Sequence, residues 1–397
     1  FKFRFCDDAF FESRVSLSEN AELGTEHMRT CFSIGMCVCA WYWMGYYTDS
    51  IIIEESVCAK CHLCPGMVPF WDELYKQIAL EFAFVNKTPL KLVHFKLGGF
   101  VTASSPWVST GAQREKSGAY GALIPMGGGK DSLVVWHQYQ QSVKTTAAAP
   151  PLLLYVADGM EEYSSSARLQ KLVAMTGNDL RLGEYYLRHD FQTQLLHRRK
   201  RSFLKPCAHP WAALVFFDSL LVAQLEGIEE VRLGYERSAD EGNGVFVQGL
   251  EVNHQFDKSS AFLRAAQEYA LLHLTPKTRK GVRVVSTLHG LWEIQIARIF
   301  CEAPELRAYL PVFLSCNDPT ERGDWCRRCE KCAFLFLLLC AWLPPTEVVE
   351  RVFGGEDMLR QEGVQRVLFR RLLGLEEGGK PLDCVGTVAE ASAAVHL

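Results

Sequence analysis

The pattern of hydrophobic and polar positions changes along the chain. Before residue 115, short β-like runs at 1–5, 51–53 and 92–95 accompany one helical stretch over 70–85. From residue 120 onward, short apolar runs typical of buried strands alternate with runs of helical period. The expected strands span 120–126, 152–157, 231–235 and 282–286, and the expected helices begin at Ser132 and span 211–225, 261–272 and 291–300. This alternation predicts an α/β fold in which crossover helices connect the strands of a parallel sheet.

The same pattern indicates where the chain divides into domains. A passage rich in Gly, Ser and Pro over residues 98–111 is typical of a boundary. We therefore expect a mixed α/β, β-rich N-terminal domain over 1–115 and a parallel-sheet domain over 116–315. A cysteine-containing helical region is expected over 316–375, and residues 376–397, which show no periodicity, are expected to form a mobile tail.

Two apolar stretches raise the question of a membrane span. Residues 30–48 carry no charge, but Ser, Gly and clustered aromatic residues interrupt them, which favours a core strand pair or helix. Residues 333–346 are too short to cross a bilayer and are expected to form a buried helix. The sequence thus predicts a protein without a membrane partner.

Composition and charge narrow the class of protein. With 397 residues, of which 48% are hydrophobic, the chain is not a disordered one and can bury a large core. A net charge of -4 gives no general reason to expect nucleic acid as a partner, and it leaves the oligomeric state open. The 15 cysteines are partly clustered, which indicates a reducing compartment. We expect a cytoplasmic location, or an organellar stroma if a targeting peptide precedes Phe1.

A glycine-rich segment between an expected strand and an expected helix carries the strongest local signal for chemistry. It consists of Gly127, Gly128, Gly129, Lys130, Asp131 and Ser132. A turn of this kind directs free backbone N–H groups and the helix dipole toward a phosphate. Lys130 can neutralise phosphate charge, Asp131 can hold Mg²⁺, and Ser132 can donate at the helix start. A glycine turn without a ligand is the alternative.

The segment matches neither of the two common nucleotide fingerprints. A Walker loop requires Ser or Thr after the lysine, where this chain has Asp131, and a dinucleotide fingerprint requires a different glycine spacing. The segment resembles the Ser-Gly-Gly-x-Asp-Ser loop (PP-loop) of enzymes that cleave ATP to AMP and pyrophosphate. Gly127 stands where the first Ser is usual, so one hydroxyl contact to phosphate is absent.

Four cysteines near the C-terminus have the spacing of a metal site. They are Cys316, Cys326, Cys329 and Cys332. Four local thiolates match a structural Zn²⁺ site of the Cys₄ type, and Arg327, Arg328 and Lys331 offset their charge. An iron–sulfur cluster also uses closely spaced cysteines and is the alternative. The spacing resembles the zinc site of 7-cyano-7-deazaguanine synthases, which share the PP-loop.

A second cysteine group and two polar blocks complete the candidate chemistry. Cys58, Cys61 and Cys64 have metal-like spacing but lack a clear fourth ligand. Residues 234–243 follow an expected strand, and residues 251–259 precede an expected helix. Ligands of parallel sheets bind beyond the carboxyl ends of the strands, so both blocks are expected near the glycine-rich segment.

Several blocks together resemble a known enzyme family. Residues 120–132, 236–239, 251–256, 315–317 and 325–332 are similar to UDP-N-acetyl-α-D-muramoyl-L-alanyl-L-glutamate epimerases, and residues 82–86 resemble that family's amino-terminal region. The chain departs from the family at Arg327, where Gly is usual, and over 58–64, which has no family counterpart. The resemblance implies a PP-loop ATP-pyrophosphatase domain with a small Cys₄ zinc subdomain. It also implies ATP- and Mg²⁺-dependent inversion of the terminal L-Glu of a UDP-linked muramoyl dipeptide, through an acyl-adenylate, with release of AMP and pyrophosphate.

The implied reaction needs groups that remove and return a proton. Adenylation removes the carboxylate charge and makes the α-proton easier to abstract, and a base and an acid must then act on opposite faces. The candidates are His254, Glu236, Asp257 and Lys258. Arg237 and Lys258 can clamp a carboxylate or phosphate. Asp158, just past the second expected strand, faces the nucleotide or caps a turn.

Two other functions remain open at the level of sequence. The zinc spacing is also compatible with a PP-loop enzyme that adenylates a nucleobase or tRNA, for which the basic run 198–201 with Lys205 would contact RNA. A short basic run is more often a solvated face, so we expect no nucleic-acid partner. The other alternative is a nucleotide-binding regulator without turnover.

Overall fold

A five-stranded parallel sheet forms the centre of the computed structural model, which describes residues 2–4, 10–12, 23–99, 118–146, 148–157, 166–184, 209–277, 280–317, 320, 323–360, 364–376 and 380–397. The strand order is β11-β8-β5-β6-β7. The strands are β5 (Ala122–Pro125), β6 (Pro151–Ala157), β7 (Leu180–Glu184), β8 (Glu230–Leu233) and β11 (Arg283–Ser286). The order reverses between β5 and β8, which makes the sheet doubly wound. The carboxyl ends of the strands at such a reversal are where open α/β sheets generally bind ligands. The expected α/β fold class is confirmed.

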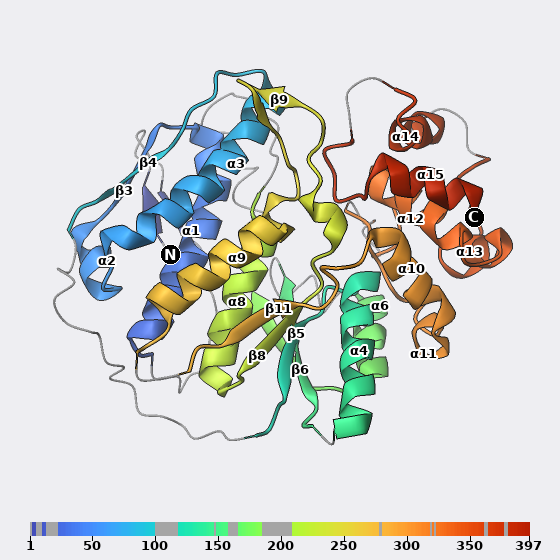
Figure 1. Ribbon diagram of the computed structural model, residues 1–397, viewed down its shortest axis with the longest axis horizontal. Coiled ribbons are helices and arrows are strands. Elements are labelled where there is room, and N and C mark those ends of the chain that lie inside the picture. The colour runs from blue at the N-terminus through green and yellow to red at the C-terminus, as the bar shows by residue number, and fades with distance from the viewer. Residues whose placement is uncertain are drawn as a thin grey trace.

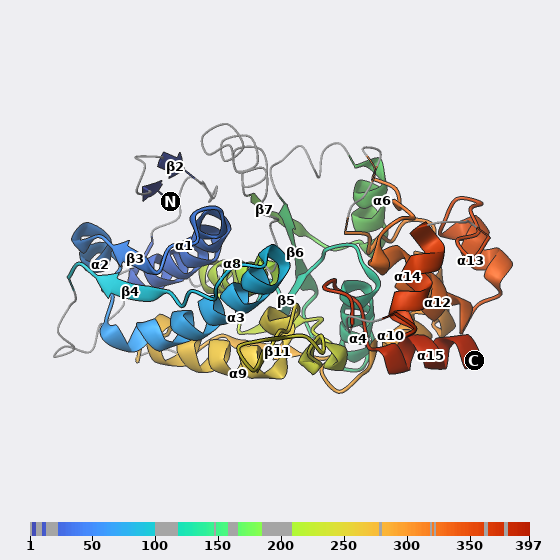
Figure 2. The ribbon, with the colours of Figure 1, turned by 90° about the horizontal axis from the view of Figure 1, so that it is seen from above.

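Helices cover both faces of the sheet (Figures 1 and 2). They include α4 (Lys130–Thr146), α6 (Ala167–Thr176), α8 (Trp211–Glu226), α9 (Ser260–Tyr269, continued by a π-helical turn over Ala270–Leu274) and α10 (Glu293–Glu302). Successive side chains of a strand point to opposite faces, so Leu123 packs with α8 and the N-terminal helices, whereas Ile124 packs with α4 and α10. The expected strands and helices of this region are all present. The structure adds β7 and α6, whose short sequences carry little periodicity.

The N-terminal region contains more helix than the sequence suggests. Its elements are β1 (Lys2–Arg4), β2 (Phe10–Glu12), α1 (Thr25–Tyr46), β3 (Ser50–Ile53), α2 (Glu55–Lys60), a 3-10 turn (Pro65–Met67), α3 (Val68–Asn86) and β4 (His94–Leu97). The expectation of a β-rich domain is wrong because the uncharged stretch 30–48 forms helix α1, which packs along α8 and is buried on nearly all sides. None of the helices in the described part of the chain is long and apolar enough to span a membrane.

The C-terminal region is a group of helices beside α10. They are α11 (Pro304–Arg307), α12 (Glu330–Cys340), α13 (Pro345–Arg351), α14 (Val364–Leu372) and α15 (Val388–His396). The expected buried helix is α12, which is surrounded by α10, α13, α14 and α15. The expected mobile tail is wrong for residues 380–397. Thr387 and Glu390 form a capping box at the start of α15, and Ala391 and Ala394 are buried.

Short polar elements lie at the carboxyl edge of the sheet. They are the 3-10 turns Arg237–Asp240 and Phe256–Lys258 and the hairpin of β9 (Phe246–Val247) and β10 (Leu250–Glu251). The hairpin packs against α3. Segments from the N-terminal region, the sheet domain and the C-terminal tail therefore meet at one edge.

Candidate active site

The glycine-rich segment links β5 to α4 at the point where the strand order reverses. Gly128 has a φ of +79°, which favours glycine, and its carbonyl accepts a hydrogen bond from the Leu314 amide at 2.9 Å. A Cβ on Gly129 would lie 2.7 Å from Ser315 Oγ, whereas a Cβ on Gly127 would have no neighbour within 4 Å. The turn is thus closed on one side by residues 314–315 and open at Gly127, as a phosphate-binding turn must be.

Lys130 lies at the centre of a buried charge network. Its ammonium contacts Asp131 and Glu293, and all three of the side chains Lys130, Glu293 and Lys331 are almost completely buried. Glu293 Oε1 also accepts from Lys331 Nζ at 3.1 Å. Burial would favour the neutral carboxyl, but the two ammonium groups outweigh it and hold the pKa of Glu293 far below its usual range. Burial likewise opposes the charge of Lys130, yet Asp131 and Glu293 raise its pKa, so the lysine is positively charged at neutral pH.

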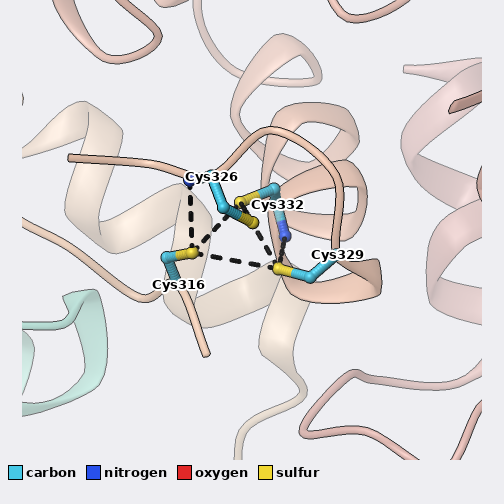
Figure 3. Close-up of side chains that lie close together, drawn as sticks. All are labelled: Cys316, Cys326, Cys329 and Cys332. Atoms are coloured by element: carbon cyan, nitrogen blue, oxygen red, sulfur yellow. Dashed lines mark hydrogen bonds between the residues drawn. The ribbon is translucent and has the colours of Figure 1, made fainter. Parts of the chain in front are cut away.

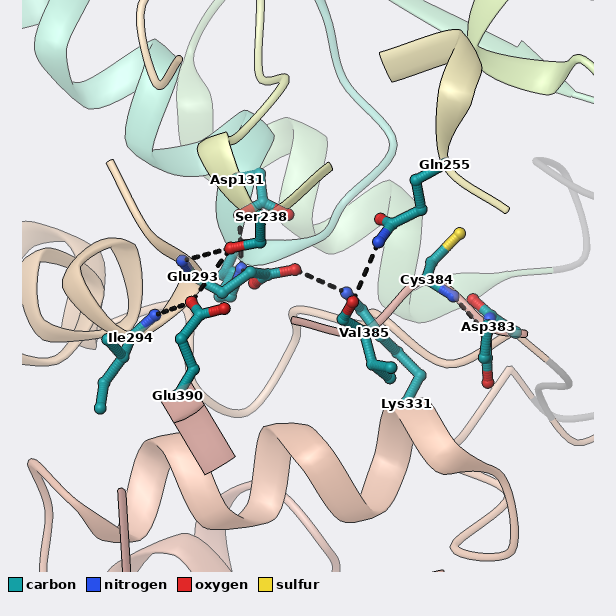
Figure 4. A network of polar contacts seen from close by, with 12 residues as sticks. Asp131, Ser238, Gln255, Glu293, Ile294, Lys331, Asp383, Cys384, Val385 and Glu390 are labelled. Atoms are coloured by element: carbon teal, nitrogen blue, oxygen red, sulfur yellow. Dashed lines mark hydrogen bonds and ion pairs between the residues drawn. The ribbon is translucent and has the colours of Figure 1, made fainter. Parts of the chain in front are cut away.

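A second network fastens the C-terminal tail to this site (Figure 4). Ser238 Oγ donates to Glu390 Oε1 at 3.0 Å and accepts from the Glu293 amide at 3.2 Å. The same oxygen of Glu390 accepts from the Ile294 amide at 3.2 Å. Asn243 Nδ2 donates to the Pro381 carbonyl at 2.8 Å. The tail is therefore held by the polar block 234–243 and by the start of α10.

Two of the predicted catalytic residues lie among charged groups near the glycine loop. Glu236 is 2% exposed, and burial together with the nearby charges of Glu293 and Asp131 raises its pKa in spite of the Lys258 ammonium. Burial opposes the charge of Lys258, but the neighbouring acidic groups, which include Glu236 and Asp131, raise its pKa well above its usual range. Lys258 is therefore a cation near the glycine loop.

His254 contacts two residues that the sequence did not suggest. Its Nδ1 lies 3.0 Å from both carboxylate oxygens of Glu81, which projects from α3. Its Nε2 lies 3.9 Å from Cys384 Sγ in the C-terminal tail. No sequence signal pairs residues so far apart in the chain, although Glu81 directly precedes the family-like block 82–86.

The remaining predicted residues have other contacts. Asp257 Oδ2 accepts from the amides of Ala212 and Ala213 at 2.7 and 3.2 Å, so its carboxylate caps the start of α8. Ser132 Oγ donates to the Gly129 carbonyl at 3.0 Å. The exposed guanidinium of Arg237 lies 4.8 Å from the centre of the Trp292 ring. Asp158 lies outside the described residues.

The four C-terminal cysteines converge on one point (Figure 3). Four of their Sγ–Sγ distances are 3.5, 3.6, 3.7 and 3.9 Å. Thiolates bound to one tetrahedral Zn²⁺ at about 2.3 Å lie roughly 3.8 Å apart, so the geometry fits a single ion, and it is far from the distance of a disulfide. The amides of Cys326, Arg328 and Cys332 each donate to one of the sulfurs at 3.4 Å. The cluster is compatible with a structural metal.

The other cysteine group does not converge. Cys58 Sγ donates to the Ile53 carbonyl at 3.6 Å, and Cys64 Sγ contacts His273 Nδ1 at 3.8 Å. Cys61 is buried, and its carbonyl accepts from Arg29 Nε at 3.3 Å. Among the described residues, the groups that could hold a metal are the Cys₄ cluster and the set His254, Asp383 and Cys384.

These features define a class of protein: a doubly wound α/β protein with a glycine-rich loop at the switch point of its sheet and a four-cysteine centre beside it. The chain belongs to the MurL family. The model described as MurL N-terminal domain matches residues 1–279, and the model described as MurL C-terminal domain matches residues 312–397. The family resemblance found in the sequence is confirmed.

Curated relatives carry the name UDP-N-acetyl-alpha-D-muramoyl-L-alanyl-L-glutamate epimerase. The protein of Salinispora tropica is 28% identical over 84% of this chain and 66% of its own length. Those of Micromonospora sp. and Xanthomonas oryzae pv. oryzae are 36% and 34% identical over 47% and 45% of this chain, and over 40% and 38% of their own lengths. The chain thus spans less than two thirds of the curated relatives it matches.

Among solved structures, one similar chain is the U34-tRNA thiolase NcsA from Methanococcus maripaludis with its [4Fe-4S] cluster. The TM-score is 0.31 at 15% identity, over 67% of this chain and 86% of that one.

Proposed function

We propose that the protein inverts the terminal L-Glu of UDP-N-acetylmuramoyl-L-alanyl-L-glutamate to D-Glu in an ATP-dependent reaction that releases AMP and pyrophosphate. The observation that carries the proposal is the match of both MurL domain models, which together cover most of the chain. The names of the curated relatives support the same substrate, a UDP-linked muramoyl dipeptide used to build peptidoglycan.

The glycine loop is the proposed site of ATP cleavage. Gly127, Gly128 and Gly129 offer backbone amides to the phosphates, Lys130 offsets their charge, and Ser132 lies at the helix start. Asp131 would hold Mg²⁺, a hard cation that prefers oxygen ligands. The pairing of Lys130 with Glu293 supports this assignment, because it keeps the ammonium charged and in place before ATP arrives.

The Cys₄ cluster is the proposed structural zinc site, which when occupied would fix the chain around residues 316–332. Two contacts relate this site to the ATP loop. The Leu314 amide donates a hydrogen bond to the Gly128 carbonyl. Lys331 lies between two of the cysteines, and its ammonium donates to the Glu293 carboxylate. A rigid Cys₄ centre would therefore help to hold the glycine loop in the conformation described above, in which the turn is open at Gly127.

Proton transfer is assigned to the charged residues around His254 and Lys258. Adenylation of the glutamate carboxylate makes it an electron sink, after which a base and an acid can act at the α-carbon. Asp257 is a weaker candidate than the sequence suggests, because its carboxylate already caps α8. Glu236 lies beside Lys258 and would keep that side chain protonated. Arg237, which is exposed at the same edge, would bind a carboxylate or phosphate of the substrate.

The test is incubation with the muramoyl dipeptide and ATP in D₂O. Deuterium entering the glutamate α-carbon together with formation of AMP and pyrophosphate is the expected result. Release of AMP only with RNA or a deazapurine would instead identify a nucleobase- or tRNA-modifying enzyme and refute the proposal. ATP binding without turnover on any of these substrates would identify a regulator.

A further inference from the structure

Three side chains from distant parts of the sequence form a line from the interior to the surface of the site. Glu81 on α3 is 1% exposed, and His254, which follows β10, is 19% exposed. Cys384 in the C-terminal tail is partly exposed. The His254 ring lies between the other two, with Nδ1 at 3.0 Å from both Glu81 oxygens and Nε2 at 3.9 Å from Cys384 Sγ. The thiol is therefore partly exposed, whereas the buried carboxylate can act only through the imidazole.

We propose that Cys384 is a catalytic residue, which exchanges a proton with the glutamate α-carbon on one face, and that His254 and Glu81 hold its thiol in position. This assignment rests on the proposed epimerase function and names the base that the function requires. The arrangement of thiol, imidazole and orienting carboxylate is the one that activates a cysteine in general. Glu81 accepts the Nδ1 proton and fixes the ring, so Nε2 faces the sulfur.

The charges around the thiol favour the ionised form. Burial favours the neutral thiol, but the Lys258 ammonium, the contact with His254 and the Lys331 ammonium outweigh it and lower the pKa of Cys384. Burial alone would lower the pKa of His254, but Glu81 and Cys384 raise it well above its usual range. A thiolate beside an imidazolium is the expected ground state.

The chain contains a matched pair without these features. Cys64 Sγ lies 3.8 Å from His273 Nδ1, nearly the same separation as in the Cys384–His254 pair. There, burial and the neighbouring Arg29 guanidinium lower the pKa of His273, so no imidazolium is available to stabilise a thiolate. The difference between the two pairs arises from the charged partners, Glu81 in one case and Arg29 in the other.

Cys384 also lies on the side of the site where the activated carboxyl is expected. The charges of Cys384 and Asp131 both raise the pKa of Lys258, so the thiol and the glycine loop lie within electrostatic range of one ammonium group. Figure 4 shows the tail carrying Cys384 on the same side of the network as Gln255, whose Nε2 donates to the Val385 carbonyl at 2.9 Å. The thiol is therefore held in place by the polar block 251–259.

The proposed step balances without any further reactant. The Cys384 thiolate takes the α-proton, so the Cα–H bond breaks, an S–H bond forms, and the electron pair moves onto the acyl oxygen of the adenylate. The Lys258 ammonium then gives a proton to the opposite face, where the same electron pair forms the new Cα–H bond. One proton has moved from Lys258 to Cys384, and exchange with water restores both groups. No atom is oxidised or reduced.

The first test separates adenylation from proton exchange. In Cys384→Ser, we expect the first-turnover burst of pyrophosphate to stay within about threefold of wild type, because the ATP loop is unchanged. Deuterium entry at the glutamate α-carbon should fall at least ~100-fold, the usual contribution of a general base. Cys64→Ser is the matched control and should exchange deuterium at the wild-type rate. Exchange at that rate by Cys384→Ser would overturn the proposal, whereas absence of any dipeptide-dependent pyrophosphate in wild type would overturn the proposed function instead.

The second test uses wild-type protein and needs no substrate. A short pulse of iodoacetamide at pH 6.5, followed by peptide mass mapping, should label Cys384 at least ~10-fold faster than Cys64, because only thiolates react. His254→Asn and Glu81→Gln should each remove most of this advantage and shift the labelling profile to higher pH, as expected of positioning residues. Equal labelling of the two thiols would contradict the proposal. Faster labelling of Cys384 after treatment with a chelator would show that His254, Asp383 and Cys384 bind a metal instead, and would also overturn it.

Discussion

Glu293 is the residue whose replacement tests the buried charge network most directly. It is fully buried and is the shared partner of Lys130 and Lys331, which are themselves 0% and 7% exposed. Glu293→Gln keeps the size and shape of the side chain and removes one negative charge. Two buried ammonium groups would then share Asp131 as their neighbouring anion. We expect a large loss of stability from a nearly isosteric change.

The size of the loss follows from the cost of breaking a buried ion pair, which is about 3–5 kcal/mol. A chain of 397 residues has an unfolding entropy of roughly 0.8 kcal/mol/K at about 2 cal/mol/K per residue. The expected decrease in Tm is therefore ~4–6 °C if the chain unfolds as a unit. Because the pKa of Glu293 is lowered, its contribution is present above the ordinary glutamate value of 4.5 and is lost as the pH falls below it. The difference from wild type should therefore be full at pH 7 and shrink in acid.

The assay is calorimetry at pH 7 and at pH 4, with Glu302→Gln as the control. Glu302 lies on the same helix and pairs with Arg298 at 2.9 Å, but both side chains are more than half exposed. An exposed pair contributes at most about 1 kcal/mol, so this control should lower Tm by ~1 °C or less. Adding Lys331→Met to Glu293→Gln should recover part of the loss by removing one unpaired charge. Equal Tm values for Glu293→Gln and Glu302→Gln at pH 7 would refute the network argument.

Three further predictions concern the loop, the α8 cap and the Cys₄ centre. Gly128→Ala should destabilise the protein by about 1–2 kcal/mol because of its positive φ. Gly127→Ala should leave Tm unchanged and lower pyrophosphate release. Equal Tm values for the two variants in thermal melts would contradict this prediction. Asp257→Ala should lower the free energy of unfolding by about 1–2 kcal/mol, because the cap of α8 is lost. Asp257→Asn can still cap the helix and should keep both stability and deuterium exchange. Loss of exchange in Asp257→Asn would show that Asp257 is catalytic. Metal analysis should find one zinc ion per chain, and Cys329→Ser should lose it together with a lower Tm; full zinc content in that variant would exclude the Cys₄ site.

The sequence predicted the elements that depend on local pattern. The bounds of strand β6 and helix α8 were predicted within one or two residues. Each is a run of apolar residues that ends at turn signals, as is typical of the buried elements of a parallel-sheet domain. The glycine loop could be predicted because the local structure requires glycine there. The backbone of Gly128 has a positive φ, and the loop makes close contacts that leave little room for side chains. The Cys₄ cluster was found because its ligands lie close together in the chain.

Contacts between distant segments could not be predicted in this way. Glu293 is a single acidic residue at a helix start, where a solvated side chain is the common outcome, and only the fold shows that two lysines surround it. Glu81 and Cys384 belong to opposite ends of the chain, and nothing local pairs them with His254. A set of candidate site residues chosen by residue type therefore omits partners that come from a distant segment of the chain.

The C-terminal tail shows why composition alone misled. Its Gly, Ala and Ser residues lack periodicity, which is typical of a mobile segment, but small residues also pack closely against other helices. The small side chains of Ala391 and Ala394 let α15 approach α12 closely. The Glu390 carboxylate accepts hydrogen bonds from the buried Ser238 hydroxyl and the Ile294 amide, which would otherwise need water as a partner. The segment is ordered by its partners and not by its own propensity.

The link between the Cys₄ centre and the glycine loop follows from the weak packing of the loop itself. Gly127, Gly128 and Gly129 have no side chains, so contacts from outside must hold the turn open for a phosphate. The Leu314 amide holds the Gly128 carbonyl, and Lys331 holds Glu293, which in turn holds Lys130. Both contacts start within two residues of a cysteine ligand. A metal at the Cys₄ centre would thus affect the proposed ATP cleavage through the position of the loop, and it would also reach the Cys384 side of the site through Lys331, whose ammonium lowers the pKa of Cys384.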